Sequence, residues 1–247
     1  MIKHAKGMNC RMQQIYLDTK DLLKTIEDAL KNQKAFSLVR IGDGENLVMS
    51  QHHVWPVSKV LQERWAIKAN RGEKGLTLPN LHLRNAVISS VKKATVVGIL
   101  PPGDNTIKAP DYLKRPLTDE VFSYYKIEPP LICHAGVNRE LAKMEEFWSL
   151  LSGRRILIIT REAAKLKERL EQEPYNQKIV HALPFDQWSE YRNTMKWVIA
   201  HKNSFDVALI SCGVSAVVLA EQIAAKSGKV ALDFGKANNI ILKGRPN

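Results

Sequence analysis

Two acidic side chains, Asp43 and Glu45, follow directly after an apolar stretch in the segment Phe-Ser-Leu-Val-Arg-Ile-Gly-Asp-Gly-Glu at residues 36–45. In an extended chain, side chains two residues apart point to the same side, so both carboxylates would face one divalent ion. Mg²⁺ or Mn²⁺ typically takes one or two protein carboxylates and completes its coordination with water and phosphate oxygens. Gly42 and Gly44 allow a sharp turn and a close approach to a ligand. The segment therefore predicts a metal and phosphate site, with Asp43 and Glu45 as the metal ligands.

The same residues have a second interpretation as the start of a helix. Asp43 would then be the N-cap and Glu45 would lie in the first turn, where acids stabilise free backbone amides. Arg40 favours a functional interpretation, because a guanidinium in an apolar strand is costly to bury unless it is paired. We expect Arg40 to contact the acid pair or a ligand phosphate, with an edge position facing water as the alternative.

The elements that must position these groups follow an alternating pattern of strands and helices. Apolar runs predict strands at 36–41, 95–100, 155–160, 206–211 and 229–234, with a weaker one at 179–183. Helical periodicity covers 15–34, 59–70, 83–93, 139–151, 163–173, 185–202 and 215–227. Several strands are apolar at nearly every position, as expected when helices cover both faces of a sheet.

This alternation predicts an α/β fold, a Rossmann-like three-layer sandwich with a mostly parallel central sheet. We expect a single domain over residues 1–247, with residues 1–35 as an N-terminal helical extension. The segment 101–116 contains four prolines and is predicted to be a loop or lid.

Ligands of an open parallel sheet bind beyond the carboxyl ends of its strands, where loops and helix N-termini converge. The strand at 206–211 leads through Gly213 and Val214 into a helix that begins near Ser215, and free amides at a helix N-terminus suit a diphosphate. A structural turn capped by Ser215 is the alternative. The landings of the other strands also carry glycine or charge, which predicts one shared cleft.

Two further groups of residues follow apolar segments. Asp233, Gly235 and Lys236 come at the end of the last strand, and Asn138 and Arg139 stand at a helix start, where an anion would bind. Capping by Asn138 alone explains the second group equally well.

Composition limits the class of partner. The chain has 37 Lys and Arg against 25 Asp and Glu, a formal charge of +12, which favours an anionic partner or a solvated basic surface. No RNP, KH or helix-turn-helix signature is present, so nucleic acid is not the expected partner. No apolar run is long enough to span a bilayer. The cysteines at positions 10, 133 and 212 form no CxxC pair, so we expect them reduced, in a cytoplasmic protein or one held peripherally at the inner membrane face.

Four ordered blocks resemble a known family. They are the segment at 36–45, His-Ala-Gly-Val-Asn-Arg-Glu-Leu at 134–141, Gly-Arg-Arg-Ile-Leu-Ile-Ile at 153–159, and residues 206–220 followed by Gly-Lys-Val-Ala-Leu-Asp-Phe-Gly at 228–235. Together they are similar to the GT-D fold glycosyltransferases, first catalogued as a domain of unknown function, whose Asp-x-Glu motif lies in an Arg-x-Gly-Asp-Gly-Glu context.

The resemblance implies a metal-dependent enzyme that moves a sugar from a nucleotide diphosphate donor, typically a UDP-sugar, to a glycan, glycoprotein or lipid-linked acceptor. It implies that Asp43, Glu45 and Arg40 are the catalytic residues, and that Asp43 and Glu45 hold Mn²⁺ or Mg²⁺ and the donor diphosphate. The donor site would also take in Gly42, Gly44, Asn138, Arg139, Gly213, Val214, Ser215, Asp233, Gly235 and Lys236. Where relatives often have histidine after the last strand, this chain has Lys236, a poor metal ligand at neutral pH.

Several alternatives stay open at this point. The chain could be a non-catalytic relative that retains nucleotide binding, or a basic nucleic-acid-binding or regulatory protein on the same fold. In either case, or as an enzyme, it could form a homo-oligomer. Asp104 and Glu140 are candidate catalytic bases, with ordinary loop and helix-end roles as their alternatives. Trp188 and Tyr191 are candidates to stack on a uracil base, with core packing as the alternative.

Overall fold

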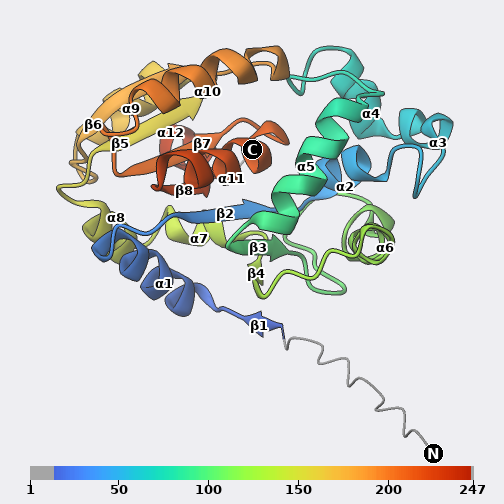
Figure 1. Cartoon of the computed structure of the whole chain (residues 1–247), viewed down its shortest axis with the longest axis horizontal. Helices are drawn as coiled ribbons and strands as arrows, with labels where there is room; N and C mark the ends of the chain where they lie inside the picture. The colour runs from blue at the N-terminus through green and yellow to red at the C-terminus, as the bar shows by residue number, and fades with distance from the viewer. Residues whose placement is uncertain (1–13, 246–247) are drawn as a thin grey trace, which may run out of the picture.

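The structure, a computed structural model, describes residues 14–245 and contains one eight-stranded sheet (Figure 1). Its strands in chain order are β1 (Ile15–Tyr16), β2 (Phe36–Arg40), β3 (Val96–Ile99), β4 (Leu131–His134), β5 (Ile156–Thr160), β6 (Ile179–Pro184), β7 (Val207–Ser211) and β8 (Val230–Asp233). Their order in space is β1-β4-β3-β2-β8-β7-β5-β6, and each neighbouring pair is parallel. Parallel neighbours require crossover connections, which the helices provide.

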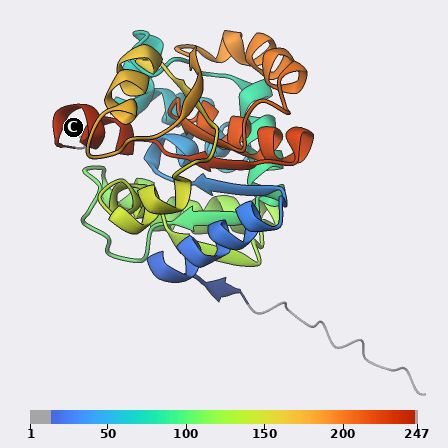
Figure 2. The same ribbon diagram turned by 90° about the vertical axis from the view of Figure 1, so that its left-hand side faces the viewer.

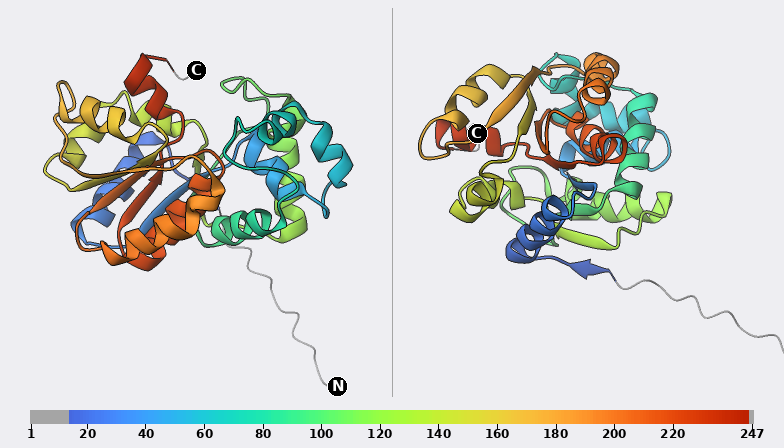
Figure 3. Two further views of the ribbon diagram at one scale, coloured as in Figure 1. Left: turned by 90° about the horizontal axis from the view of Figure 1, so that it is seen from above. Right: turned by 60° about the vertical axis from the view of Figure 1, so that its left-hand side comes forward.

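The helices lie on both sides of this sheet (Figure 2). They are α1 (Thr19–Lys31), α2 (Asp43–Ser50), α3 (Val57–Gln62), α4 (Arg64–Asn70), α5 (Leu81–Lys93), α6 (Arg115–Tyr125), α7 (Val137–Leu141), α8 (Glu145–Leu151), α9 (Ala163–Glu171), α10 (Tyr191–Ala200), α11 (Ser215–Ser227) and α12 (Ala237–Lys243), with 3₁₀ turns η1 (Asp111–Leu113) and η2 (Trp188–Glu190). Figure 3 shows the segment from α2 to α4, together with α6, at one end of the molecule, away from α8 and α9.

Two hydrophobic cores lie against opposite faces of the sheet. One contains residues of α2, α5, α6, α10 and α11, and the other contains residues of α1, α7, α8, α9 and α12. The alternation of strand side chains divides them: along β2, Val39 belongs to the first core and Leu38 to the second. The predicted three-layer α/β fold is therefore confirmed, and the predicted, mostly parallel sheet is parallel throughout these eight strands.

All six strands predicted from the sequence are present within one or two residues, and the helix at 215–227 is reproduced as α11. The predicted helix at 15–34 is wrong at its start. Ile15 and Tyr16 pair in parallel with β4, and Asp18 caps α1 by accepting a hydrogen bond from the amide of Asp21. The proposed N-terminal helical extension at 1–35 falls partly on residues 1–13, which lie outside the described residues. Within its remainder, β1 joins the sheet, and Leu22 and Ile26 of α1 are fully buried in the second core.

Two predicted helices are each divided into two. The helix expected at 59–70 is interrupted at Glu63, and that expected at 139–151 at Met144, because both residues have extended backbone. The segment expected to be a loop at 101–116 ends in η1 and the first turn of α6, where Pro116 is tolerated because a helix N-terminus needs no intrahelical amide there. The sequence pattern also missed β1, β4, α6 and α12, which have two, four, eleven and seven residues.

The described part of the chain contains no helix that is both long enough and apolar enough to cross a membrane.

Candidate functional site

A cavity of about 390 Å³ opens at the carboxyl edge of the sheet. The loops after β2, β4, β5, β6, β7 and β8 all contribute to its wall, and the loop after β3 contributes Ile107. The landings of four of the five clearly predicted strands therefore meet in space, whereas residues 101–104 do not line the cavity. The lining residues are Arg40, Ile41, Gly42, Asp43, Gly44, Glu45, Trp65, Glu73, Lys74, Ile107, Ala135, Arg139, Thr160, Arg161, Glu162, Phe185, Asp186, Ser211, Cys212, Gly213, Val214, Gly235, Lys236, Asn238 and Asn239.

The acid pair lies in the first turn of α2 and not in extended chain. Gly42 is the N-cap, Asp43 is the first helical residue, and the Glu45 carboxylate accepts a hydrogen bond from the amide of Gly42 at 2.9 Å. Residues two apart in a helix lie on different sides, so the expected same-side geometry of an extended chain is wrong. The helical interpretation is the correct one, although the N-cap is Gly42 and not Asp43. Both acids nevertheless border the cavity.

Burial controls the protonation of Glu45. Its withdrawal from water, followed by the negative charges of Asp233 and Asp43, raises the pKa of Glu45 to about 7. The hydrogen bond from Gly42 opposes this shift but does not cancel it. A cation or an additional donor placed beside the pair would favour its charged form.

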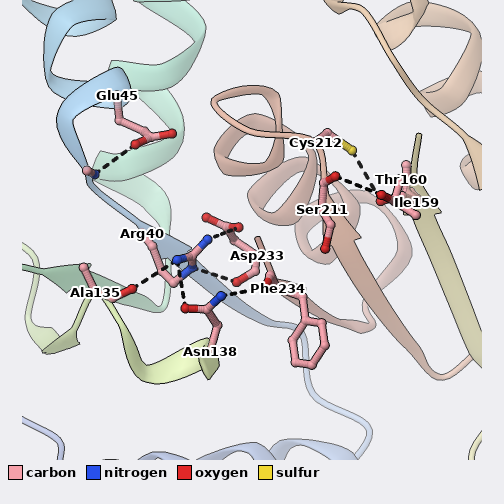
Figure 4. Close-up of polar contacts among 11 residues, drawn as sticks. Arg40, Glu45, Ala135, Asn138, Ile159, Thr160, Ser211, Cys212, Asp233 and Phe234 are labelled. Carbon is pink, nitrogen blue, oxygen red and sulfur yellow. Dashed lines mark hydrogen bonds and ion pairs between the residues drawn. The ribbon is translucent and has the colours of Figure 1, made fainter. Parts of the chain in front are cut away.

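Arg40 does not reach the acid pair. Its guanidinium forms an ion pair with Asp233 at 2.7 Å and also donates to the carbonyl of Asp233 at 2.9 Å. Further bonds run to the carbonyl of Ala135 at 3.1 Å and to Asn138 Oδ1 at 3.0 Å, as Figure 4 shows. Asn138 in turn donates to the carbonyl of Phe234 at 2.7 Å. The expectation that Arg40 must be paired is confirmed, but among the described residues its partner is Asp233 of β8.

Gly235 allows this network to form. Its φ is +42°, and a Cβ at this position would lie 1.9 Å from Arg40 Nη2. Gly44 makes a similar allowance, since a Cβ there would lie 2.5 Å from the ring of Trp65. Both glycines are therefore required by the close approach of a large side chain.

Positive side chains gather at the cavity. Partial withdrawal from water, followed by the charges of Arg139 and Lys74, lowers the pKa of Lys236, whereas Asp43 opposes this shift. The pKa of Arg139 is likewise lowered, by withdrawal from water and then by Arg40. Cations that lower one another's pKa are held together at an electrostatic cost, which an anionic ligand would offset. Arg161, by contrast, already forms an ion pair with Asp186.

Three of the expected donor-binding residues do not line the cavity. All three are buried: Asn138 is 0% exposed, and Ser215 and Asp233 are each 2% exposed. Asn138 accepts a hydrogen bond from the Arg40 guanidinium, and Asp233 forms an ion pair with it. Ser215 is the first residue of α11, and its side chain does not cap the helix. The capping alternatives for Asn138 and Ser215 are therefore wrong, because the N-caps of α7 and α11 are Gly136 and Val214.

The two candidate bases also lie away from the cavity wall. Asp104 accepts a hydrogen bond from Thr106 and pairs with His134 Nε2 at 2.9 Å, and these contacts lower its pKa despite the opposing effect of burial. Glu140 accepts a hydrogen bond from Thr19. Both acids are committed to holding loops and helices together.

The aromatic residues that line the cavity, Trp65 and Phe185, are not those expected from the sequence. Trp188 and Tyr191 stack on each other with ring centroids 4.7 Å apart and pack against the first core. Trp65 of α4 lines the cavity instead, as do Lys74, Thr160 and Asn238. No local signal marks these four, because α4 and α12 reach the sheet edge only through the packing of distant segments.

Replacement of Gly235 by alanine should destabilise the fold by roughly 2–4 kcal/mol, from left-handed backbone strain plus the clash with Arg40. Gly228→Ala is the matched control, since Gly228 has a φ of +73° but open space around its Cβ position. It should cost about 1–2 kcal/mol. Urea unfolding of both variants measures the difference, and equal losses would contradict a close approach of Arg40.

Glu45→Gln should change the pH dependence of stability. Because the folded pKa of Glu45 is raised to about 7, its stabilising contribution is complete below the unfolded pKa near 4.5 and is lost as pH rises through 7. Glutamine keeps an acceptor for Gly42 without this loss, so the variant should gain roughly 3 kcal/mol relative to wild type between pH 4.5 and 8. Unfolding free energies across this range test it, with Glu168→Gln on α9 as an exposed control. A pH-independent difference would contradict the burial of this carboxylate.

Comparison with known proteins agrees with the fold. A model of the GT-D fold-like domain matches residues 17–241, and no curated protein matches the chain. A solved structure described as the highly conserved domain of unknown function 1792 with a distinct glycosyltransferase fold is similar at a TM-score of 0.61 and 16% identity, over 95% of this chain and 84% of that one. A selenomethionine-substituted structure of domain of unknown function 1792 is similar at a TM-score of 0.58 and 17% identity, over 92% and 80%. The chain therefore belongs to the GT-D-like family, which supports glycosyltransferase activity in general and confirms the resemblance found in the sequence.

Proposed function

We propose that the protein is a metal-dependent glycosyltransferase that moves a sugar from a nucleotide diphosphate donor, foremost a UDP-sugar, to a glycan, glycoprotein or lipid-linked acceptor. We further propose that it acts as a single domain. The observation that carries this proposal is the gathering of Lys74, Arg139 and Lys236 around one cavity that also contains the acid pair.

The charges suit the departure of a nucleotide diphosphate. Breaking the anomeric bond builds positive charge on the sugar and negative charge on the leaving diphosphate, so cations are needed more than a proton donor. Lys236 and Arg139 line the cavity, and in this proposal they neutralise that negative charge. Their mutual repulsion in the free protein would be relieved by the ligand, which adds to its binding.

Asp43 and Glu45 fit Mg²⁺ or Mn²⁺ by the chemistry of their oxygens. The described residues contain no group of three or more His, Cys, Asp or Glu side chains that would enclose a metal. A site of one or two carboxylates completed by phosphate oxygens is the usual arrangement for Mg²⁺ bound with a nucleotide. When bound, the metal would supply positive charge to the leaving diphosphate.

Arg40 is assigned a positioning role. Its guanidinium holds β8 and α7 against β2 through Asp233, Ala135 and Asn138, and thereby fixes the backbone from which Asp43 and Glu45 follow. The candidate acid at the cavity for accepting the acceptor's proton is Glu73, since Asp186 is paired with Arg161 and Glu162 with Lys165.

The double variant Asp43→Asn, Glu45→Gln should lose sugar transfer and donor hydrolysis by at least about a hundredfold, because both substitutions remove the negative charge that would hold the metal. A screen of nucleotide sugars for Mn²⁺-dependent hydrolysis gives the measurement. Glu168→Gln should retain full activity, and circular dichroism should show that both proteins are folded.

Full activity of the double variant would contradict the assignment of the acid pair. Wild-type protein that binds UDP in calorimetry but turns over no donor would identify a non-catalytic nucleotide-binding relative. RNA binding with a steep salt dependence and no UDP binding would favour the nucleic-acid alternative.

Lys236→Met should weaken UDP binding about tenfold, because it removes one cation from the cavity while keeping a side chain of similar length. Lys226→Met is the control, since Lys226 is exposed in the last turn of α11, at the end of that helix away from the cavity. Titration calorimetry at fixed ionic strength measures both variants. Unchanged affinity in Lys236→Met would show that this lysine does not meet the diphosphate.

A further inference from the structure

An uncharged, hydrogen-bonding corner lies at the carboxyl ends of β5 and β7. It is formed by Thr160, Ser211 and Asn238, and all three residues line the cavity. Thr160 and Asn238 are 1% and 6% exposed, so their polar atoms are almost entirely enclosed by protein. We refer to these three residues as the polar corner; Figure 4 shows the strand ends that contribute Thr160 and Ser211.

The hydrogen bonds in the polar corner determine which way the Asn238 amide points. The Thr160 hydroxyl donates to the carbonyl of Ser211 at 3.1 Å, which uses its only proton. Its oxygen therefore accepts from Asn238, whose Nδ2 lies 3.1 Å away. This arrangement assigns Nδ2 to Thr160 and leaves Oδ1 on the other side of the amide.

Asn238 Oδ1 is a buried acceptor that has no hydrogen-bond partner within residues 14–245. An unsatisfied buried acceptor costs about 1–3 kcal/mol, and native proteins retain few of them without a reason. A residue that lines a cavity and carries such an atom points to a ligand that brings the missing donor. The only comparable side chain among the described residues, Gln177, has its unpartnered Oε1 away from the cavity.

The polar corner is distant from the acid pair along the sheet edge. The strand order β2-β8-β7-β5 puts three strand spacings between the end of β2 and the end of β5. At about 4.8 Å each, this is roughly 14 Å. A ligand whose diphosphate lies beside Asp43 would therefore meet the polar corner with a different, uncharged part. Arg161, the residue that follows Thr160, forms an ion pair with Asp186.

We propose that the polar corner is a specificity subsite in which Asn238 Oδ1 accepts a hydrogen bond from an N–H or O–H group on the uncharged part of the donor. This inference rests on the proposed function. The donor group is either the imide N–H of the nucleobase or a hydroxyl of the transferred sugar, and the two sources share the same chemistry at Asn238. Thr160 is a positioning residue, because it orients the amide without touching the ligand.

Calorimetric binding in the presence of Mn²⁺, with the full chain, tests this subsite. The probes are UDP, UDP-glucose and UDP methylated at the imide nitrogen. Asn238→Ala should lower the affinity for UDP-glucose about tenfold, which is the loss expected for one hydrogen bond to a neutral acceptor. If Asn238→Ala loses as much affinity for UDP as for UDP-glucose, the nucleobase is the source of the hydrogen bond. Methylation of the imide nitrogen should then weaken UDP binding by the wild-type protein but not by the variant. A loss confined to UDP-glucose identifies the sugar.

Two further variants separate recognition from stability. Gln177→Ala removes the other amide with an unpartnered buried oxygen, so it should lower the melting temperature without changing any affinity. Thr160→Val removes the hydroxyl that orients Asn238 and should weaken the same probe as Asn238→Ala, by a smaller factor. It also provides the test if Asn238→Ala fails to fold.

If the wild-type protein binds UDP-glucose and Asn238→Ala binds it with the same affinity, the subsite is overturned and the proposed function stays intact. Equal affinity losses in Asn238→Ala and Gln177→Ala would overturn it as well, because the effect would then be a general one on the fold. A wild-type protein that binds neither UDP nor UDP-glucose would overturn the proposed donor, and the subsite with it.

Discussion

The ion pair between Arg40 and Asp233 is the interaction on which the rest of the site depends. It lies at the centre of the sheet, where β2 and β8 are neighbours, and both side chains are largely buried. A buried ion pair is tolerable only when its remaining hydrogen-bonding groups are satisfied. Carbonyls of β8 and of the segment after β4, together with Asn138, meet that requirement. The glycine at 235 follows from the same constraint, since any side chain there would occupy the position of the guanidinium.

Arg40 is committed to this network, so the electrostatics of the cavity depend on the other charged side chains that border it. Glu45 and Lys236 show opposite responses to the same cavity: withdrawal from water favours the neutral form of each, raising one pKa and lowering the other. The free protein thus holds charged groups in an arrangement that is unfavourable without an anion and a cation beside them. A metal-bound diphosphate has this charge pattern, which links the electrostatics of the cavity to the function that we propose.

The fold was largely predictable because its core strands carry a strong local signal. Strands such as β5 and β7 are apolar at successive positions and buried on both faces, so composition alone distinguishes them. The two-residue β1 and the four-residue β4 carry too short a pattern, and β1 exists only because β4 offers it backbone partners. The division of the helices at Glu63 and Met144 likewise depends on packing, since neither residue is a helix breaker.

By itself, the sequence determined the class of fold, the family, and the place of the acid pair after the first core strand. Those features depend on local periodicity and on an ordered set of short motifs, both of which are written along the chain. Only the tertiary structure decided that Arg40 pairs with Asp233 and donates a hydrogen bond to Asn138. It also decided that Trp65 and Asn238 reach the cavity. These contacts join residues that are far apart in the chain, and the energy that selects them comes from burial and charge pairing that exist only once the sheet has formed.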